Sequence, residues 1–183
     1  MLLIVALAST LPAQSLTARI DGDQLRISAP RLHFLIGEAL ERLHNGATVN
    51  YDFELTLRSE KAGTPIAVVK QRFAISYDLW EEKFAVTKLE PSPRSVSHVS
   101  AASAEAWCID GLAVSAAGLA AAQPFWIRLD FRANAPSAGE NEADNSSFTL
   151  SSLIDIFSRR NRGEHVNGFE EAGPLRLDRL KKR

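Results

Sequence analysis

The sequence predicts a mainly β protein, an antiparallel β-sandwich or twisted sheet with two short helical insertions and a C-terminal helix. Two segments with strict alternation of apolar and polar residues carry this prediction, residues 49–57 and 125–133. A period of two gives a strand one face in a core and one face in water, which is typical of antiparallel sheets. Short turn sequences between the strands favour hairpins over the long crossovers of a parallel sheet.

The composition is that of one folded domain of ordinary size with tails. The chain has 183 residues, of which 45% are hydrophobic and 23% charged, a mixture that can bury a core. The formal net charge of -1 gives no general attraction to nucleic acid or anionic lipid, so an electrostatic partner needs a local patch. Cys108 is the single cysteine, so no intramolecular disulfide forms, and its apolar neighbours predict a buried side chain.

Residues 1–15 are typical of a signal peptide. An apolar run over residues 2–8 is followed by small and polar residues, with Ala13 and Ser15 placed as at a signal-peptidase site. The run is far shorter than the roughly 20 apolar residues that span a bilayer. No basic residue precedes Arg19, and a buried first strand is the alternative. We therefore expect an exported protein, periplasmic or secreted, with no integral membrane span in the mature chain.

The β-rich domain is expected to cover residues 16–134. It begins with two short strands joined by Asp21-Gly22-Asp23, a sequence with turn chemistry. Apolar residues at helical spacing then predict a helix over residues 36–44, which Asn45-Gly46 ends. The remaining predicted elements are strands at 49–57, 66–77, 83–89 and 125–133, with a helix at 101–110 that Ser103 can cap.

The C-terminal part changes in composition. Residues 135–147 are rich in Pro, Ser, Gly and Asn and predict a flexible linker. Residues 148–162 contain an apolar stripe at helical spacing, which predicts the C-terminal helix. Residues 163–183 are charged, and we expect a disordered tail there. Acidic residues nearly balance its basic ones, so a solvated tail is preferred to one that binds lipid or nucleic acid.

Catalytic, metal and cofactor motifs are missing from the sequence. The four histidines are scattered singly, and no HExxH or CxxC spacing occurs. The chain contains neither a GxSxG nucleophile elbow nor a glycine-rich phosphate loop. We therefore expect a protein that is not an enzyme and that has no catalytic residue, no metal site and no cofactor.

Candidate binding residues come from exposed aromatic positions and from the apolar stripe. Trp80 and Glu81 fall in a hairpin connection, and Trp126 lies on the polar face of its strand. Tryptophan buries much area at little entropic cost, which favours it as a contact residue. Leu153 and Phe157 belong to the C-terminal stripe. The alternative is that one of the predicted helices covers the two tryptophans; we prefer it for Trp126, and both readings stay open for Trp80.

Several motifs match a pattern found among exported bacterial proteins. They are Glu38-Ala39-Leu40 followed by Gly46, the strand at 49–57, Phe73-Ala74-Ile75-Ser76-Tyr77-Asp78-Leu79, Trp107, and the strand at 125–131. With these motifs the chain resembles a family of exported bacterial proteins that carry a domain of unknown function, over most of residues 16–134. Residues 148–153 resemble the end of that family's domain but lack its usual tryptophan. The resemblance implies an exported β-rich domain, often encoded near a membrane sensor kinase, and carries over no catalytic residues.

The leading hypothesis is an exported, non-catalytic binding or adaptor domain at the cell envelope, with an envelope protein or membrane sensor as its partner. The alternative is a small-molecule or lipid carrier that uses the sandwich interior or the face beneath Trp80 and Trp126. A hydrolase is a third hypothesis, which needs carboxylates or a Ser–His pair to meet in a cleft.

Overall fold

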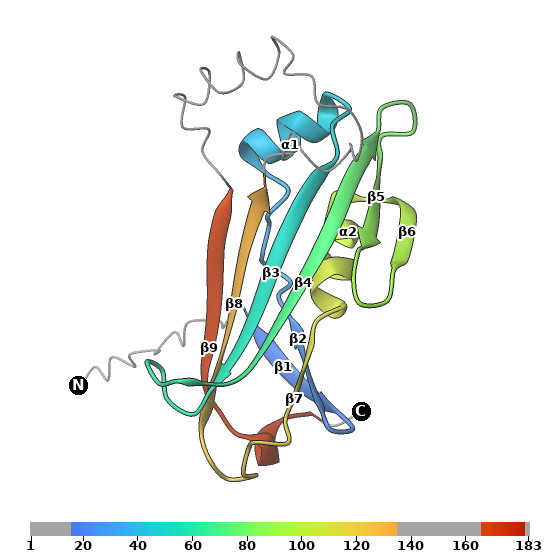
Figure 1. The fold of residues 1–183 in the computed structure, drawn as a ribbon. Helices are drawn as coiled ribbons and strands as arrows, with labels where there is room; N and C mark the ends of the chain where they lie inside the picture. Colours follow the sequence, from blue (N-terminus) through green and yellow to red (C-terminus); the bar gives the residue numbers. More distant parts are fainter. Residues whose placement is uncertain (1–15, 135–165, 182–183) are drawn as a thin grey trace, which may run out of the picture.

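Antiparallel strands form two sheets in the computed structural model, which describes residues 16–134 and 166–181 (Figure 1). The larger sheet has the order β6 (Arg94–Val99), β5 (Lys83–Lys88), β4 (Pro65–Asp78), β3 (Val49–Arg58), β8 (Phe125–Asn134), β9 (Asn167–Leu175). The smaller sheet has the order β1 (Thr17–Asp21), β2 (Gln24–Ser28), β7 (Ala113–Ser115). The helices are α1 (Gly37–His44), α2 (Ala101–Asp110) and the short 3-10 helix η1 (Leu177–Arg179). The predicted mainly β, antiparallel class is confirmed.

The alternating strands β3 and β8 form the centre of the larger sheet, as their pattern predicts. Tyr51, Phe53, Leu55 and Leu57 of β3 are buried, while the residues between them are polar. Phe125, Ile127 and Leu129 of β8 are also fully buried. The inner face of this sheet is covered by α2 and the smaller sheet (Figure 1). The two helices predicted inside residues 16–134 are confirmed as α1 and α2.

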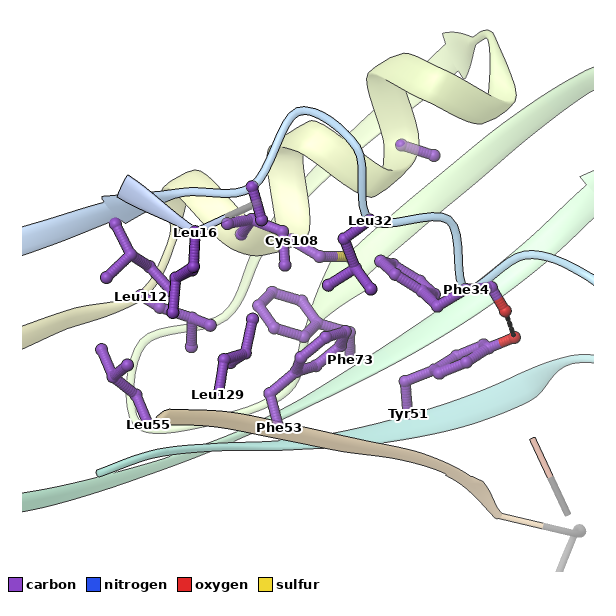
Figure 2. Close-up of a cluster of buried hydrophobic side chains, with 14 of the residues drawn as sticks. Leu16, Leu32, Phe34, Tyr51, Phe53, Leu55, Phe73, Cys108, Leu112 and Leu129 are labelled. Atoms are coloured by element: carbon purple, nitrogen blue, oxygen red, sulfur yellow. Dashed lines mark hydrogen bonds between the residues drawn. The ribbon is translucent and has the colours of Figure 1, made fainter. Parts of the chain in front are cut away.

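Residues 29–36, called here the crossing segment, connect β2 to α1 without regular structure and place Ala29, Leu32, Phe34 and Leu35 in the core. Phe34 is fully buried in this segment, and its ring centroid lies 4.9 Å from that of Tyr51 and 5.1 Å from that of Phe53. The hydroxyl of Tyr51 donates a 3.0 Å hydrogen bond to the carbonyl oxygen of Phe34 (Figure 2). The crossing segment is thereby tied to the larger sheet.

Glu105 of α2 binds the crossing segment from the other side. Its Oε1 accepts hydrogen bonds from the backbone N–H of Phe34 at 2.8 Å and of Leu35 at 2.9 Å. Its Oε2 lies 2.9 Å from Nδ1 of His33. Backbone groups in a core need such partners, because an unpaired buried N–H costs the free energy of a lost hydrogen bond. A buried acidic residue is therefore explained by structure and is not a sign of catalysis.

Burial also changes the chemistry of two side chains in this core. Burial raises the pKa of the Tyr51 phenol far above its ordinary value, and the charge of Glu105 adds to the effect. Tyr51 therefore stays protonated and is the donor of the hydrogen bond to the carbonyl oxygen of Phe34. Burial likewise raises the pKa of the Cys108 thiol, which is fully buried as predicted. A thiol that stays protonated is a poor nucleophile, so Cys108 acts as a small apolar core residue.

Two sequence expectations are wrong, and residues 94–99 form an edge strand, β6, that was not among the predicted elements. The tail at 163–183 was expected to be disordered, but residues 167–175 form β9, which pairs with β8 at the other edge of the same sheet. The β-rich unit therefore extends beyond residue 134. The cap of α2 is Ser100, whose Oγ accepts a 3.2 Å hydrogen bond from the N–H of Ser103, the residue we expected to be the cap.

Strand β9 was missed because its packing depends on glycine and not on an apolar pattern. A Cβ atom at Gly168 would lie 2.7 Å from Cζ of Phe131, so the missing side chain makes room for a ring from β8. Ala172 of β9 is buried in the core. The predicted signal peptide at 1–15, the predicted linker at 135–147 and the predicted helix at 148–162, with Leu153 and Phe157, lie outside the described residues. Within the described ranges, no helix has both the length and the apolar character to cross a membrane.

We predict that Glu105→Ala lowers the free energy of unfolding by about 3 kcal/mol, because it leaves two buried N–H groups without an acceptor. Glu105→Gln is the matched control, because its side-chain oxygen still accepts from Phe34 and Leu35, and we expect a loss of about 1 kcal/mol. Urea unfolding of the full chain measures both values. Equal losses for the two variants would contradict the assigned role of the side-chain oxygen.

Candidate binding site at the tip of the β4–β5 hairpin

Residues 78–82, called here the Trp80 turn, connect β4 to β5 and carry the most exposed large apolar side chain of the described residues. Trp80 is 96% exposed and its neighbour Leu79 is 56% exposed. Scattered exposed apolar residues are common on protein surfaces, but an almost fully exposed tryptophan presents a large area of apolar surface to water. The sequence left the exposure of Trp80 open, and the structure places it in solvent.

Asp78 closes the Trp80 turn. Its Oδ1 accepts hydrogen bonds from the backbone N–H of Trp80 at 2.8 Å and of Glu81 at 3.0 Å. Aspartate favours turns because its short side chain reaches the backbone two or three residues further on. The N–H groups of Glu81 and Trp80 hold the pKa of Asp78 below its ordinary value, because they stabilise the ionised form. Asp78 thus holds the backbone of the turn at Trp80 in place.

Glu81 and His98 tie the Trp80 turn to the neighbouring strand β6. Oε2 of Glu81 lies 2.9 Å from Nε2 of His98, and Nδ1 of His98 lies 2.9 Å from Oγ of Ser97. A bulge brings His98 to this position: Phe84 pairs with Val99 and Val86 pairs with Val96, so β6 has one more residue than β5 over this stretch. Bulges commonly turn a side chain in a new direction.

The backbone conformation of the turn is also costly. Glu82 has a φ of 53° and His98 a φ of 60°, and they are the non-glycine residues with positive φ in the described chain. Such conformations cost of order 1 kcal/mol each and persist where the surrounding structure imposes them. At the base of the hairpin, the ring of Tyr77 lies 4.5 Å from that of His44 and 4.8 Å from that of Phe84. The turn is therefore held by the ring contacts of Tyr77 at its base and by the contact between Glu81 and His98 of β6.

Trp126, the second candidate, lies in a different environment. It is partly buried, and a Cβ atom at Gly173 of β9 would come within 2.3 Å of its Cδ1. Its indole ring therefore packs directly on the β9 backbone. This covering strand belongs to the segment that was expected to be a tail, whereas the sequence suggested a helix as the cover. The structure brings Trp126 and Trp80 to no common site, because they lie on β8 and on the β4–β5 turn.

The outer face of the larger sheet carries charges that neutralise one another. Asp52 accepts from Arg72 at 2.8 Å and from Asn134 at 2.7 Å. Burial acts to raise the pKa of Asp52, but these hydrogen bonds outweigh it and the pKa is lowered. Arg128 forms an ion pair with Asp130 at 2.7 Å, and its guanidinium lies 4.0 Å from the ring centroid of Phe169. Exposed ion pairs of this kind are typical of a solvated surface.

No group of three potential metal ligands gathers within the ranges 16–134 and 166–181. Comparisons with protein-family models, with curated proteins and with solved structures found no match to this chain. Of the supporting residues, Asp78 had a sequence signal, an aspartate that opens a short connection between strands. His98 had none, because its position arises from the bulge.

We predict that Asp78→Ala makes the Trp80 turn mobile, because two backbone N–H groups lose their acceptor. The backbone order parameter of Trp80, measured by 15N relaxation, should fall from about 0.85 to below about 0.6. Asp78→Asn is the control, because its side-chain carbonyl can accept both hydrogen bonds, and it should retain most of the order. Since the folded pKa of Asp78 lies below 3.8, we expect the turn to stay ordered above that pH and to loosen as the pH falls through the lowered value.

We predict that Gly173→Ala lowers the free energy of unfolding by about 2 kcal/mol, because the new methyl group overlaps the Trp126 ring. The double variant with Trp126→Ala should show a smaller combined loss than the sum of the two single losses, because the overlap is removed. Thermal or urea unfolding of the four proteins in this cycle gives the coupling energy. Strict additivity would show that the ring does not pack on Gly173.

Proposed function

We propose that this protein is an exported, non-catalytic binding or adaptor domain that docks on a protein partner at the cell envelope through the Trp80 turn. The observation that carries the proposal is the near-complete exposure of Trp80 on a turn held by Asp78 and by the Glu81–His98 contact. Because the backbone at Trp80 is fixed before binding, the turn loses little backbone freedom when the ring enters a pocket. Tryptophan is also enriched among the residues that dominate interface energies.

The charges around Trp80 favour a protein partner over an anionic membrane surface. Asp78, Glu81 and Glu82 surround it, with Lys83 and His98 as the nearby basic residues. Anionic lipid attracts basic segments, so this acidic surrounding acts against insertion into such a bilayer. A partner with an apolar pocket and a basic rim would complement both the ring and the acids.

Export and the envelope location rest on the sequence of residues 1–15 and on the family resemblance. An envelope protein, including a membrane sensor, is the class of partner that this location implies. The carrier alternative receives no support from the core, because Phe34, Phe53 and Phe73 fill the space beneath α2 in the described structure (Figure 2). We therefore retain the docking function alone.

We predict that a photo-crosslinker placed at Leu79 captures a protein from envelope fractions of the cells that express the chain. With that protein purified, Trp80→Ala should weaken binding about 100-fold, because a hot-spot side chain of this kind contributes on the order of 2–3 kcal/mol. Phe169→Ala is the matched control: it removes another aromatic residue, 57% exposed, on the outer face of the larger sheet.

Three results decide between the alternatives. Loss of binding in Trp80→Ala with unchanged binding in Phe169→Ala supports docking through the turn. Equal binding of Trp80→Ala and the parent chain would contradict it. Binding of the full chain to phosphatidylglycerol vesicles that depends on Trp80, with no protein captured, would replace the protein partner with a membrane surface.

A further inference from the structure

A cleft separate from the Trp80 turn lies where the end of β5 and the start of β6 meet the C-terminal end of α2 and the smaller sheet. Its volume is about 380 Å³, within the size of small-molecule sites. Three basic side chains, one acidic side chain and two aromatic rings line it. These residues are Arg26, Lys88, Arg94, Asp110, Phe73 and Trp107.

Two of the basic residues face each other across neighbouring strands. Lys88 pairs with Phe73 of β4 on one side and with Arg94 of β6 on the other, so the side chains of all three lie on one face of the sheet. Like charges directly opposite each other destabilise a sheet. Within the described ranges, neither Lys88 nor Arg94 forms an ion pair, whereas Arg26 is paired with Asp21 at 2.8 Å.

Lys88 and Arg94 differ in this respect from two cations on the outer face of the same sheet. There, Lys70 lies 3.1 Å from Glu54, and Arg72 lies 2.8 Å from Asp52. Lys70 and Arg72 are thus neutralised by the neighbouring strand. Two adjacent cations without an acidic partner form a local excess of positive charge in a recess, which is the feature that an anionic ligand would neutralise.

Two aromatic residues are among those that line the cleft. The rings of Phe73 and Trp107 meet edge to face, with centroids 5.9 Å apart. Phe73 is fully buried and Trp107 is partly buried, so the indole is the more accessible of the two. Aromatic lining with a few polar groups is the usual composition of a site for a small organic molecule.

We propose that this cleft binds a small organic anion with a carboxylate or phosphate group on a flat apolar body. Lys88 and Arg94 bind the anionic group, and Trp107 contacts the body. The proposal goes beyond the docking function, because the cleft lies at the end of β5 opposite to the Trp80 turn and shares no residue with it. Failure of one proposal therefore leaves the other standing.

The first test is a titration of the full 15N-labelled chain with benzoate and with phenyl phosphate, up to about 10 mM. We expect the shifts to be concentrated at the Trp107 indole N–H and at the amides of Gly111 and Ala113. The stronger of the two ligands identifies the anionic group. Benzamide, which lacks the charge, and inorganic phosphate, which lacks the ring, should each bind at least about tenfold more weakly.

The second test asks whether Lys88 and Arg94 bind the ligand directly, or whether removing any positive charge from the protein has the same effect. Lys88→Gln and Arg94→Gln should each weaken binding of the better ligand about tenfold. Lys83→Gln is the control, because Lys83 is an exposed residue of the same strand on the opposite face from Lys88, and it should leave binding unchanged. The melting temperature of Lys88→Gln should stay equal or rise, because the variant removes a repulsion between strands.

Four results would overturn the site. They are the absence of shifts at Trp107 with either aryl anion, equal binding of benzamide, equal binding of inorganic phosphate, and an equal loss in Lys83→Gln. A Lys88→Gln variant that melts at a lower temperature but binds normally would show that Lys88 has a structural role, and it would also overturn the proposal.

Discussion

The buried contact between Glu105 and the backbone of the crossing segment is the constraint on which the rest of the structure depends. Residues 29–36 have no regular structure, so the buried N–H groups of Phe34 and Leu35 lack the partners of a helix or strand and depend on a side chain. Glu105 accepts from Phe34 and Leu35, and Tyr51 donates to Phe34, which joins α2, the crossing segment and the larger sheet. The ring of Phe34 then completes an aromatic core with Tyr51 and Phe53. The buried polar groups of Glu105 and Tyr51 thus pair with backbone groups inside the apolar core.

Both candidate sites lie outside the core. Large side chains occupy the space beneath α2 (Figure 2). Strand β4, with 14 residues, extends to the end of the sheet where α1 lies, and the Trp80 turn follows it there (Figure 1). Strand β5 returns from that turn and ends at the cationic cleft. One hairpin therefore carries both candidate sites at its two ends.

The sequence predicted the elements whose signal is local. The alternation in residues 49–57 and 125–133 was sufficient for β3 and β8, and helical spacing was sufficient for α1 and α2. Strand β9 was not predicted because it packs through Gly168 and Gly173. Aromatic rings of β8 lie on these two glycines, and such a contact leaves no periodic pattern in the sequence. The candidate sites were harder still. Trp80 was predicted as a candidate binding residue, but its exposure depends on whether another element covers the turn. The cross-strand pairing of Lys88 with Arg94 depends on the strand register, which the sequence does not show.

Features that cost stability gather at the two ends of this hairpin. The Trp80 turn has an exposed indole beside one positive-φ residue, Glu82, and is tied to a second, His98. The cleft has two cations opposite each other with no ion pair in the described chain. By contrast, the buried N–H groups of Phe34 and Leu35 in the crossing segment are paired, and Asp52 on the outer face forms an ion pair with Arg72. Because natural sequences accept such costs mainly where function requires it, the position of these costs is itself an argument that both ends bind something.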